Sequence, residues 1–514
     1  MSFRILVVDD QEKTREDLKE LFHEDGNYVD TACDGVETMQ KIKSSHFDLV
    51  SLDMVMPGKN GLEVAKDIRE INKDICIMLI TDEELLKREG YDKDNIIGEL
   101  IKIGKTFTPI YKDFFTSYGK KAFSPNMRTE ILKKAHELIM SNVVINEKLI
   151  VNHGPDVSIN ESEKKVLCRL FYECEKITIS PLTSGYSGAK VFRVSPEIKG
   201  HGQDEVIVKI DWAENIYKES RNVKMFVENW LGFYKVSHIK NVCYSGEMGG
   251  IIYTLIEGSL ENLVSFMRYV QINPLKKIEK VLEELFLRTF KNWYNNKESR
   301  AFLIHVVLQE KIMNMDMLKG LVKKYFPDFK DNARVTINGI SDKVINPIYA
   351  FKGLNINDHI HSYYSYIHGD LNASNILIDT HNNCYVIDFF FTDIGFILQD
   401  FVLMELDLKL FLLDNFPLEE ICQYEKQLIK QDSYSKKIIF TENNKKIKKI
   451  YQTILIIRRI AGEITIPNNN IKHYYITLFY YNLLVLRWRP VNVIQAKRDF
   501  AVYSAMLIYE KFFK

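Results

Sequence analysis

A short segment in the second half of the chain holds side chains suited to phosphoryl transfer. Residues 366–379 read YIHGDLNASNILID, and a β-patterned run shortly afterwards ends at Asp388. Asp370 offers a carboxylate that can act as a base, while Asn375 and Asp388 offer oxygens that can bind magnesium. Moving the γ-phosphoryl group of Mg-ATP requires these groups. Each residue alone has a plainer role, Asp370 in a turn and Asn375 as a helix cap, so the prediction depends on the combination.

A phosphate-binding loop is expected upstream of this segment. Residues 177–194 read ITISPLTSGYSGAKVFRV, which indicates two strands joined by a loop. Gly185 and Gly188 in that loop lack side chains, so backbone amides there can approach phosphate oxygens closely. Any Gly-containing hairpin gives a similar pattern, and the G-x-x-G spacing differs from the G-x-G-x-x-G of protein kinases. The prediction therefore depends on the strand and helix after the loop.

The next strand and helix supply a candidate charged pair. In residues 205–210, reading EVIVKI, Lys209 on the inward face of a strand can reach the α- and β-phosphates of a nucleotide. A solvent-facing strand lysine is the plainer alternative. The partner carboxylate is expected from a helix at residues 215–231. Glu219 is the first choice for that partner, because the run KESRNVKMFV resembles the E-x-x-N segment of bacterial kinase-like domains described as ternary complex associated. Glu228 is the alternative.

A different chemistry is indicated at the N-terminus, where apolar runs end in acids. Residues 3–8, 47–52 and 75–80 are nearly continuous apolar runs, typical of buried parallel strands. Helical patterns alternate with them, which predicts an α/β fold with a doubly wound, five-stranded parallel sheet. The carboxyl ends of parallel strands meet at one edge, so the residues after these runs are expected to converge: Asp9 and Asp10, Asp53, and Thr81.

These clustered carboxylates predict a metal site. Neighbouring carboxylates repel one another unless a cation lies between them, and oxygen ligands suit Mg²⁺. Asp53 then remains available as a nucleophile toward a phosphoryl donor. Acids at strand ends also occur in other Rossmann-like folds, but the agreement of several positions in register favours the metal site.

The N-terminal pattern resembles the receiver domain of response regulators over residues 1–118, with VVDD, LDMVMPGKNG and LIT in matching order and spacing. The resemblance implies a flavodoxin-like fold in which Asp53 accepts a phosphoryl group from a histidine kinase or phosphotransfer protein. It also implies the roles of the neighbouring residues: Asp9 and Asp10 hold Mg²⁺ together with Asp53, Thr81 binds a phosphoryl oxygen, and Lys102 in LIKI pairs with the phosphate.

The chain departs from the receiver family beside Lys102. Ile103 follows it where the family has proline, and residues 99–101 offer no aromatic side chain to swing inward on phosphorylation. Lys105 is a less well placed alternative for the lysine that pairs with the phosphate. The phosphoacceptor pattern is intact, while the usual coupling through threonine and an aromatic residue is not expected.

The segment around Asp370 resembles the HGDxxxxN loop and IDF strand of aminoglycoside and choline kinase-like phosphotransferases. It resembles more closely still the bacterial kinase-like domains described as ternary complex associated, in which HGDLNxxNIL precedes an IDF strand. The resemblance implies a bilobal α+β protein-kinase-like domain that binds Mg-ATP. In it Asp370 would be the catalytic base, Asn375 and Asp388 the magnesium ligands, and His368 a residue that shapes the loop.

One departure from protein kinases follows the metal-binding strand. Residues 389–391 are three phenylalanines, so the glycine of the D-F-G motif is absent. This argues against an activation-loop switch of the protein-kinase kind.

Length and composition fit several domains and exclude some classes of function. The 514 residues carry no net charge and no basic stripe, so nothing points to nucleic-acid binding. Seven scattered cysteines without a C-x-x-C pair favour a reducing cytoplasm and no zinc site. The run at residues 474–486 is too short to span a bilayer. We expect a receiver at 1–118, a helical connector at 119–176, a kinase-like small lobe at 177–258 and a mainly helical large lobe at 259–514.

Together these features predict a cytoplasmic two-component signalling protein. Phosphorylation of Asp53 would regulate a kinase-like output that transfers a phosphoryl group from Mg-ATP to an unknown hydroxyl acceptor. The alternative is a catalytically inactive kinase-like module that acts as a phosphorylation-gated scaffold for a protein partner. Acceptor identity, the direction of regulation and the oligomeric state are not encoded in any motif, because fold and motif do not determine them.

Overall fold

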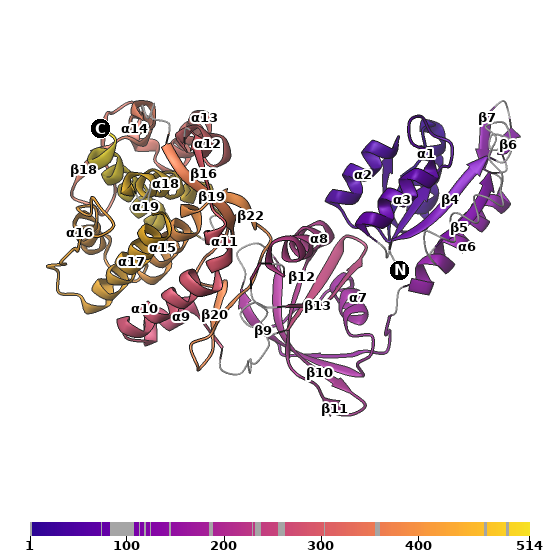
Figure 1. Ribbon diagram of the computed structural model, residues 1–514, viewed down its shortest axis with the longest axis horizontal. Coiled ribbons are helices and arrows are strands. Elements are labelled where there is room, and N and C mark those ends of the chain that lie inside the picture. The colour runs from indigo at the N-terminus through magenta and orange to yellow at the C-terminus, as the bar shows by residue number, and fades with distance from the viewer. Residues whose placement is uncertain are drawn as a thin grey trace. The chain divides into compact units, whose positions relative to one another are not determined.

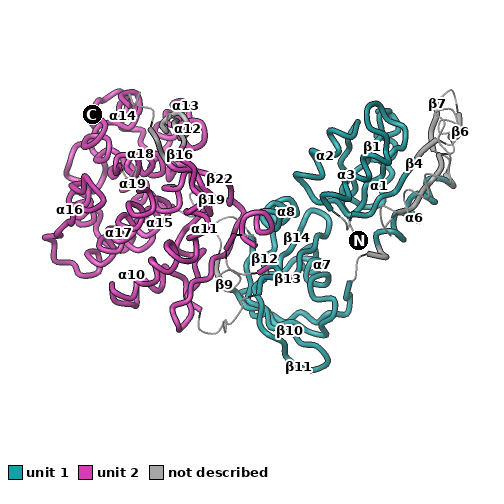
Figure 2. The backbone as a smooth tube through the Cα atoms, viewed as in Figure 1, with its two compact units in different colours: residues 1–221, 239–254 teal, residues 222–238, 255–514 magenta. Residues whose placement is uncertain are grey.

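The structure is a computed structural model that divides into two compact units, residues 1–221 with 239–254 and residues 222–238 with 255–514 (Figure 2). The residues it describes are 3–72, 75–82, 107–112, 114–117, 120–123, 125–142, 145–184, 189–228, 230–231, 238–254, 263–302, 304–354, 360–466, 470–489 and 493–514. Each unit is described by itself. None of the helices within these ranges combines the length and the apolar composition that crossing a membrane would need.

The first unit begins with the expected parallel sheet (Figure 1). Its five strands lie in the order β2-β1-β3-β4-β5, and all are paired in parallel, which confirms the predicted doubly wound sheet. The strands are β1 (Arg4–Val8), β2 (Tyr28–Ala32), β3 (Leu49–Leu52), β4 (Cys76–Asp82) and β5 (Phe107–Lys112). β1 and β3 are buried along their whole length because helices cover both faces.

Three helices connect the first four strands: α1 (Glu12–Glu24), α2 (Gly35–Ser44) and α3 (Gly61–Ile71). The side chain of Asp34 accepts a hydrogen bond from the Glu37 amide at the start of α2. At the start of α3, Asn60 and Glu63 form a reciprocal capping box. Local sequence therefore determines where these helices begin.

The core around the parallel sheet extends beyond residue 118. Helix α6 (Pro125–Asn142), assigned from the sequence to the connector, contributes Met127, Ile131, Ala135, Leu138 and Ile139 to the cluster that contains β1 and α1 side chains. Between β5 and α6 lies a hairpin of β6 (Phe114–Ser117) and β7 (Lys120–Phe123). The spacing of the buried α6 residues is helical, but the sequence alone does not say which domain they face.

A second sheet in the first unit has the order β13-β14-β12-β10-β9-β8, with β11 on β10. Its strands are β8 (Ile150–His153), β9 (Lys176–Ser184), β10 (Lys190–Ile198), β11 (His201–Gly202), β12 (Val206–Trp212), β13 (His238–Ser245) and β14 (Met248–Thr254). Helix α7 (Glu161–Leu170) packs on it, and helix α8 (Ala213–Asn222) follows β12. Since β8 and α7 belong to this sheet and its core, we call residues 145–221 with 239–254 the small lobe.

The second unit is mainly helical, as expected for residues 259–514. Two short sheets, β15-β20-β21 and β16-β19-β22, carry the segment from residue 360 to residue 396. The strands are β15 (Val264–Ser265), β16 (Glu298–Phe302), β17 (Arg334–Thr336), β18 (Lys343–Ile345), β19 (Ile360–Ile367), β20 (Ile376–Ile378), β21 (Cys384–Val386) and β22 (Asp393–Phe396).

The helices of the second unit are η1 (Val223–Val227), α9 (Phe266–Ile272), α10 (Leu275–Glu283), η3 (Glu284–Thr289), α11 (Lys291–Asn295), α12 (Ile304–Lys311), α13 (Met315–Tyr325), η4 (Pro327–Phe329), α14 (Pro347–Gly353), α15 (Leu398–Leu412), α16 (Leu418–Leu428), α17 (Lys445–Ile464), α18 (Ile471–Leu484), η5 (Val485–Arg487) and α19 (Gln495–Phe512). Helix α15 is buried along nearly its whole length, so the other helices pack around it.

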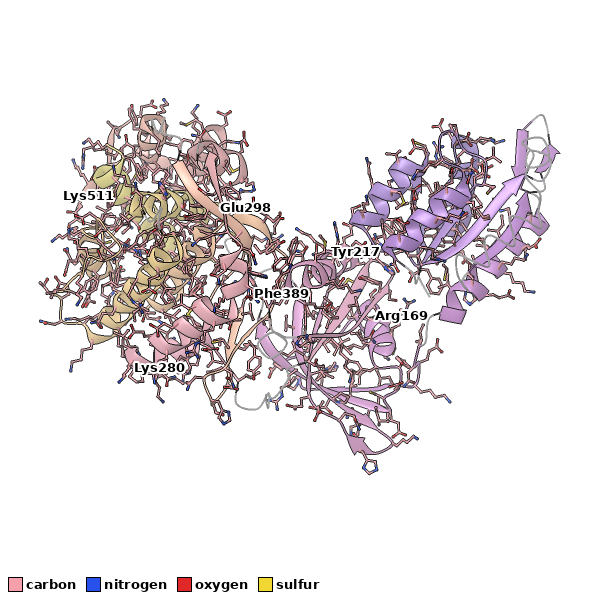
Figure 3. The ribbon with its side chains drawn as sticks, in the orientation of Figure 1. Arg169, Tyr217, Lys280, Glu298, Phe389 and Lys511 are labelled. Atoms are coloured by element: carbon pink, nitrogen blue, oxygen red, sulfur yellow. The ribbon has the colours of Figure 1, made fainter. Side chains whose placement is uncertain are left out.

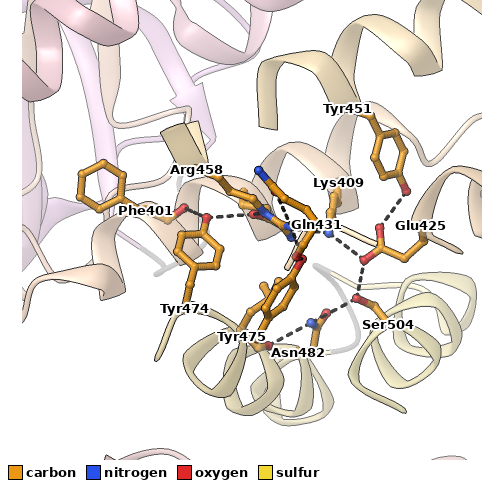
Figure 4. Close-up of polar contacts among 12 residues, drawn as sticks. Phe401, Lys409, Glu425, Gln431, Tyr451, Arg458, Tyr474, Tyr475, Asn482 and Ser504 are labelled. Atoms are coloured by element: carbon orange, nitrogen blue, oxygen red, sulfur yellow. Dashed lines mark hydrogen bonds and ion pairs between the residues drawn. The ribbon is translucent and has the colours of Figure 1, made fainter. Parts of the chain in front are cut away.

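A buried ionic network joins helices α15, α16, α17, α18 and α19, and Figure 4 draws its contacts. The guanidinium of Arg458 on α17 donates two hydrogen bonds to Glu405 on α15, at 2.8 and 2.7 Å. Lys409 on α15 lies 2.7 Å from Glu405 and 2.8 Å from Glu425 on α16. Hydroxyls complete the network, with Tyr474 on α18 donating to Glu405, and Tyr451 on α17 and Ser504 on α19 donating to Glu425.

Glu405 is the carboxylate most dependent on this network. Burial alone would raise its pKa, but the adjacent Arg458 and Lys409 outweigh that effect and lower the pKa to about 2. Its contribution to stability is therefore present above about pH 4.5 and lost as the pH falls toward 2. Removing it would leave two buried cations with an incomplete set of partners, which is strongly destabilising.

We predict that Glu405→Ala lowers the free energy of unfolding by about 3–5 kcal/mol, the range for a broken buried ion pair. Urea denaturation followed by tryptophan fluorescence measures the change. Glu463→Ala is the matched control, because its carboxylate forms a half-exposed i,i+4 pair with Arg459. That control is expected to change stability by about 0.5 kcal/mol or less. Equal effects of the two substitutions would contradict the role of the network.

Candidate functional site

The acids at the carboxyl ends of β1 and β3 lie together as expected. Carboxylate oxygens of Asp9, Asp10 and Asp53 all lie within 4.8 Å of one another. Asp9 and Asp53 are buried, with 1% and 2% of their surface exposed, while Asp10 is exposed. The Asp53 amide donates to the Val8 carbonyl at 2.8 Å, which fixes β1 and β3 in register where the acids meet.

This cluster fits a hard divalent cation. Its three carboxylates converge and supply only oxygen, the ligand that Mg²⁺ prefers. Two neighbours hold Asp9 in place: the Gln11 amide donates to its carboxylate at 2.9 Å, and Arg15 donates to its carbonyl at 2.8 Å. A cation among the three acids would offset their mutual repulsion, and this donor set suits one.

The loop after Asp53 is folded closely against it, and this requires glycine at position 61. A Cβ atom there would lie 2.3 Å from the Asp53 carbonyl oxygen and 2.9 Å from the Met54 Cα. The Gly61 amide donates to the Met54 carbonyl at 2.8 Å, which closes the loop. The PGKNG sequence therefore positions the backbone on which Asp53 stands.

The register of β4 and β5 places a threonine and a lysine toward the ends of these two strands. Thr81 pairs with Tyr111, and Asp82 pairs with Lys112. Lys102, the lysine favoured from the sequence, lies outside the described residues, as does its alternative Lys105. Lys112 ends β5, and the strand ends of a parallel sheet share one edge. The sequence signal for it was the β-patterned run FTPIY that ends in a lysine.

In the small lobe, the expected lysine–glutamate pair is formed. The Lys209 ammonium on β12 lies 2.7 Å from a Glu219 oxygen on α8, and both residues are buried. The Tyr253 hydroxyl on β14 donates to the other Glu219 oxygen at 2.6 Å. Glu228, the alternative partner, is exposed after η1. Gly185 and Gly188 lie outside the described residues.

In the second unit, the loop after β19 brings Asp370 and Asn375 together. The Asn375 side-chain nitrogen donates to the Asp370 carbonyl at 2.9 Å, and this leaves the Asn375 side-chain oxygen as its cation-binding atom. His368 is fully buried, and its Nε2 lies 3.0 Å from the Ile387 carbonyl just before Asp388. His368 therefore links the loop to the strand that ends at Asp388.

Asp370 has the electrostatics expected of a base. Burial raises its pKa, and the negative charge of Asp388 raises it further, to about 7. A carboxylate with a pKa near neutrality is suited to accept a proton from a hydroxyl group. Asp388 itself has φ 67°, a strained conformation for a residue with a side chain, and strain of this kind often occurs at functional sites.

Asn222 fixes the backbone directly after Asp388. Its side-chain nitrogen donates to the Phe389 carbonyl at 3.0 Å and to the Phe390 carbonyl at 2.9 Å. These two hydrogen bonds hold the backbone that follows Asp388. No role for Asn222 was predicted from the sequence.

Two further carboxylates that sequence reasoning missed hold the Asp370 loop from inside. Asp400 on α15 accepts hydrogen bonds from the amides of His368 and Gly369, both at 2.9 Å. Asp407, two turns further along α15, accepts one from the Ala373 amide at 2.8 Å. Both are buried, and burial raises the pKa of Asp400 to about 6 and of Asp407 to about 7. Charged residues within the largely apolar helix α15 were the signal in the sequence.

Comparison with known families finds two matches on this chain. Residues 5–92 match the response regulator receiver domain, and residues 313–487 match the family described as ternary complex associated domain 9. The second match covers Asp370, Asn375 and Asp388, and it corresponds to the resemblance noted in the sequence.

Curated relatives match a short stretch of the chain. Response regulator MprA of Mycobacterium ulcerans (strain Agy99) is 42% identical over 81 residues, which is 16% of this chain and 35% of the relative. The same protein of Mycobacterium tuberculosis (strain H37Rv) gives the same values. The chain thus spans about a third of the length of these curated relatives.

Among solved structures, response regulator TrrA from Thermotoga maritima, in complex with Mg²⁺ and a beryllium fluoride, is 35% identical. The match covers 26% of this chain and 98% of that chain, with a TM-score of 0.21. Chemotaxis protein CheY4 of Vibrio cholerae is 24% identical, with the same coverage and a TM-score of 0.22.

The raised pKa of Asp400 gives a testable pH dependence. The folded state holds the proton more tightly than the unfolded state, whose pKa is 3.8. Stability from protonated Asp400 is therefore full below about pH 4 and is lost as the pH rises through about 6. The difference between a pKa of 3.8 in the unfolded state and about 6 in the folded state corresponds to about 3 kcal/mol in the free energy of unfolding.

Asp400→Asn cannot lose a proton, so its free energy of unfolding should rise relative to wild type by up to about 3 kcal/mol between pH 4 and pH 7. Urea titrations at the two pH values, followed by tryptophan fluorescence, measure this difference. Asp316→Asn, at a side chain that is 96% exposed, is the control and should show no such change. If the difference in the free energy of unfolding between Asp400→Asn and wild type is the same at both pH values, Asp400 does not have the raised pKa.

Proposed function

Because residues 5–92 are a response regulator receiver domain, we propose that this chain is a two-component signalling protein whose phosphoacceptor is Asp53. A partner histidine kinase or phosphotransfer protein is the donor. An oxygen of Asp53 attacks phosphorus, the phosphorus–nitrogen bond of the donor's phosphohistidine breaks, and the imidazole leaves. The observation that carries the proposal is the convergence of Asp9, Asp10 and Asp53 within 4.8 Å.

Magnesium belongs to this proposal. Asp9, Asp10 and Asp53 would hold it, and when bound it neutralises charge on the incoming phosphoryl group. Asp10, which is exposed, leaves the cluster open to solvent and to a donor protein. Thr81, toward the end of β4, and Lys102, the lysine favoured from the sequence, are proposed to contact the phosphoryl oxygens.

Incubation with labelled acetyl phosphate and Mg²⁺ tests the acceptor. Wild type should gain an alkali-labile label, because an aspartyl phosphate is an acyl phosphate, and Asp53→Asn should gain none. Asp67→Asn is the control, since it alters a surface carboxylate that pairs with Lys59. A wild-type protein that stays unlabelled, or an Asp53→Asn protein that is labelled equally, would refute the proposal.

The lysine that pairs with the phosphate is tested separately. Lys102→Ala should weaken binding of beryllofluoride with Mg²⁺ about tenfold, the loss expected for one hydrogen bond to a charged group. Lys112→Ala should change binding less than about twofold. Titration followed by ¹⁹F NMR of bound beryllofluoride measures both. The reverse order of the two effects would make Lys112, at the end of β5, the phosphate-pairing lysine.

For the second half of the chain we propose a kinase-like output that binds Mg-ATP and transfers its γ-phosphoryl group to a hydroxyl acceptor. Lys209 would bind nucleotide phosphates, Glu219 would orient Lys209, and Asn375 with Asp388 would hold Mg²⁺. Asp370, with its pKa near 7, would take the proton of the acceptor hydroxyl. The match to the ternary complex associated family and the positioned Asp370 loop support this proposal.

The alternative is a module that binds nucleotide or a protein partner without catalysis. Asn222, which ties the backbone after Asp388 in place, is the observation that favours it. Mg-ATP binding and slow ATP turnover separate the two. Turnover that Asp370→Ala abolishes by about 100-fold or more while binding persists supports the enzyme. Binding without turnover, in phosphorylated and unphosphorylated protein alike, supports the module. Asp316→Ala, on the exposed face of α13, is the control.

A further inference from the structure

The carbonyl groups at the C-terminal end of receiver helix α2 have partners in the small lobe. The Tyr217 hydroxyl donates to the Ile42 carbonyl at 2.7 Å, and the Arg221 guanidinium donates to the Lys43 carbonyl at 3.0 Å. The last carbonyls of a helix lack partners within it and carry partial negative charge. Tyr217 and Arg221 stand four residues apart on α8, on one face of that helix. The hydrogen-bond donors on this face of α8 therefore complement the partial negative charge at the C-terminal end of α2.

A second set of contacts lies around Arg169 of α7, which Figure 3 labels together with Tyr217. Arg169 is 5% exposed, and its guanidinium lies 4.0 Å from the Asp48 carboxylate and 5.4 Å from the centre of the Phe3 ring. The His46 ring stacks on Tyr244 of β13, with ring centres 3.7 Å apart. A buried charge is costly unless it is paired, so Arg169 and Asp48 belong to a built interface and not to an incidental contact.

Asp48 itself is held as a charged group at this interface. Burial acts to raise its pKa, but His46, Arg169 and a hydrogen bond from the Arg4 amide at 2.7 Å together lower it. The Arg4 side chain also reaches toward α8, with its guanidinium 3.5 Å from the Glu214 carboxylate. We call the receiver residues of this interface the docking edge: Phe3, Arg4, Ile42, Lys43, His46 and Asp48.

The docking edge and the phosphoacceptor lie at opposite ends of the same strands. Asp48 directly precedes β3 and Asp53 directly follows it, while Arg4 begins β1 and Asp9 follows it. At about 3.3 Å per residue, Asp48 and Asp53, on either side of β3, are separated by roughly 16 Å. Both strands are fully buried, so a displacement at one end is transmitted along a packed element.

On the small-lobe side, the same helix carries the partner of Lys209. Glu219 lies between Tyr217 and Arg221 on α8, and it is the residue that holds the Lys209 ammonium at 2.7 Å. Asn222, the next residue after Arg221, holds the carbonyls behind Asp388. A shift of α8 would therefore move the group that positions Lys209.

We infer that the docking edge is the surface through which the receiver acts on its own small lobe, and that occupation of Asp53 shifts helix α8 and the Lys209–Glu219 pair. This inference rests on the proposed function of the receiver and names its regulated element. The receiver and the small lobe are the two partners. Occupation of Asp53 changes the relative populations of two packings of α8 and adds no chemical step.

Hydrogen exchange of the full chain, read by mass spectrometry, tests the inference with beryllofluoride and Mg²⁺ as the probe. Binding of the probe should change exchange in the peptide covering residues 213–222 by at least about threefold in wild type. Asp53→Asn should show no change. The double variant Tyr217→Phe with Arg221→Met should still bind beryllofluoride by ¹⁹F NMR and lose the response of α8.

Matched controls are Tyr172→Phe and Arg288→Met, which remove a hydroxyl and a guanidinium from exposed side chains. Both should respond as wild type does. An α8 peptide that is unchanged while beryllofluoride is bound, or a Tyr217→Phe, Arg221→Met protein that responds fully, would overturn the inference and leave the receiver function intact. Absence of bound beryllofluoride would overturn both. Absence of ATP binding would remove only the kinase-like output, because the exchange measurement needs no nucleotide.

Discussion

A carboxylate removed from water needs a compensating positive group, and the functional parts of this chain are arranged around carboxylates of this kind. Glu219 is held by Lys209 and Tyr253, Asp400 by two backbone amides, and Glu405 by Arg458 and Lys409. When the groups that compensate a buried carboxylate are fixed in place, the helix or loop that carries the carboxylate is held rigidly. Helix α15 shows this most clearly, since it is fixed by the ionic network at Glu405 and in turn fixes the loop that carries Asp370.

The cluster at the edge of the receiver sheet differs from these sites. Asp9, Asp10 and Asp53 converge on a point that suits a metal ion, and phosphorylation of Asp53 would change the charge there. A site whose charge is variable can act as a switch, whereas sites with fixed partners hold the rest in place. Strands β1 and β3 connect this variable site to the docking edge, which faces helix α8.

Much of the fold could be predicted from local pattern. The apolar runs at residues 3–8, 47–52 and 75–80 end where acids or threonine begin, and parallel pairing then forces Asp9 and Asp53 together. The pairing of Lys209 with a carboxylate of the following helix also followed from local pattern, whereas the choice of Glu219 followed from the resemblance of the run around it. Assignments that depend on long-range packing did not follow from pattern. Helix α6 has the same helical spacing whether it covers the receiver or a connector.

Two kinds of site residue were beyond local pattern. Lys112 is a candidate only once β4 and β5 are paired, because register is a property of the sheet and motif spacing favours Lys102. In the sequence, Asp400 and Asp407 have no evident partner within a largely apolar helix. In the folded chain they accept hydrogen bonds from the amides of His368, Gly369 and Ala373. These partners lie far from the acids in the sequence, so no helical or strand spacing pattern predicts the contacts.

The most direct test of the account is the dissociation constant of Mg-ATP for the full chain, measured with and without beryllofluoride on the receiver. If Asp53 and the Lys209–Glu219 pair are coupled through α8, the two constants should differ by at least about fivefold, the low end of typical coupling between sites. By linkage, Mg-ATP should change the affinity for beryllofluoride by the same factor. Equal dissociation constants for Mg-ATP in wild type, measured with and without bound beryllofluoride, would contradict the account.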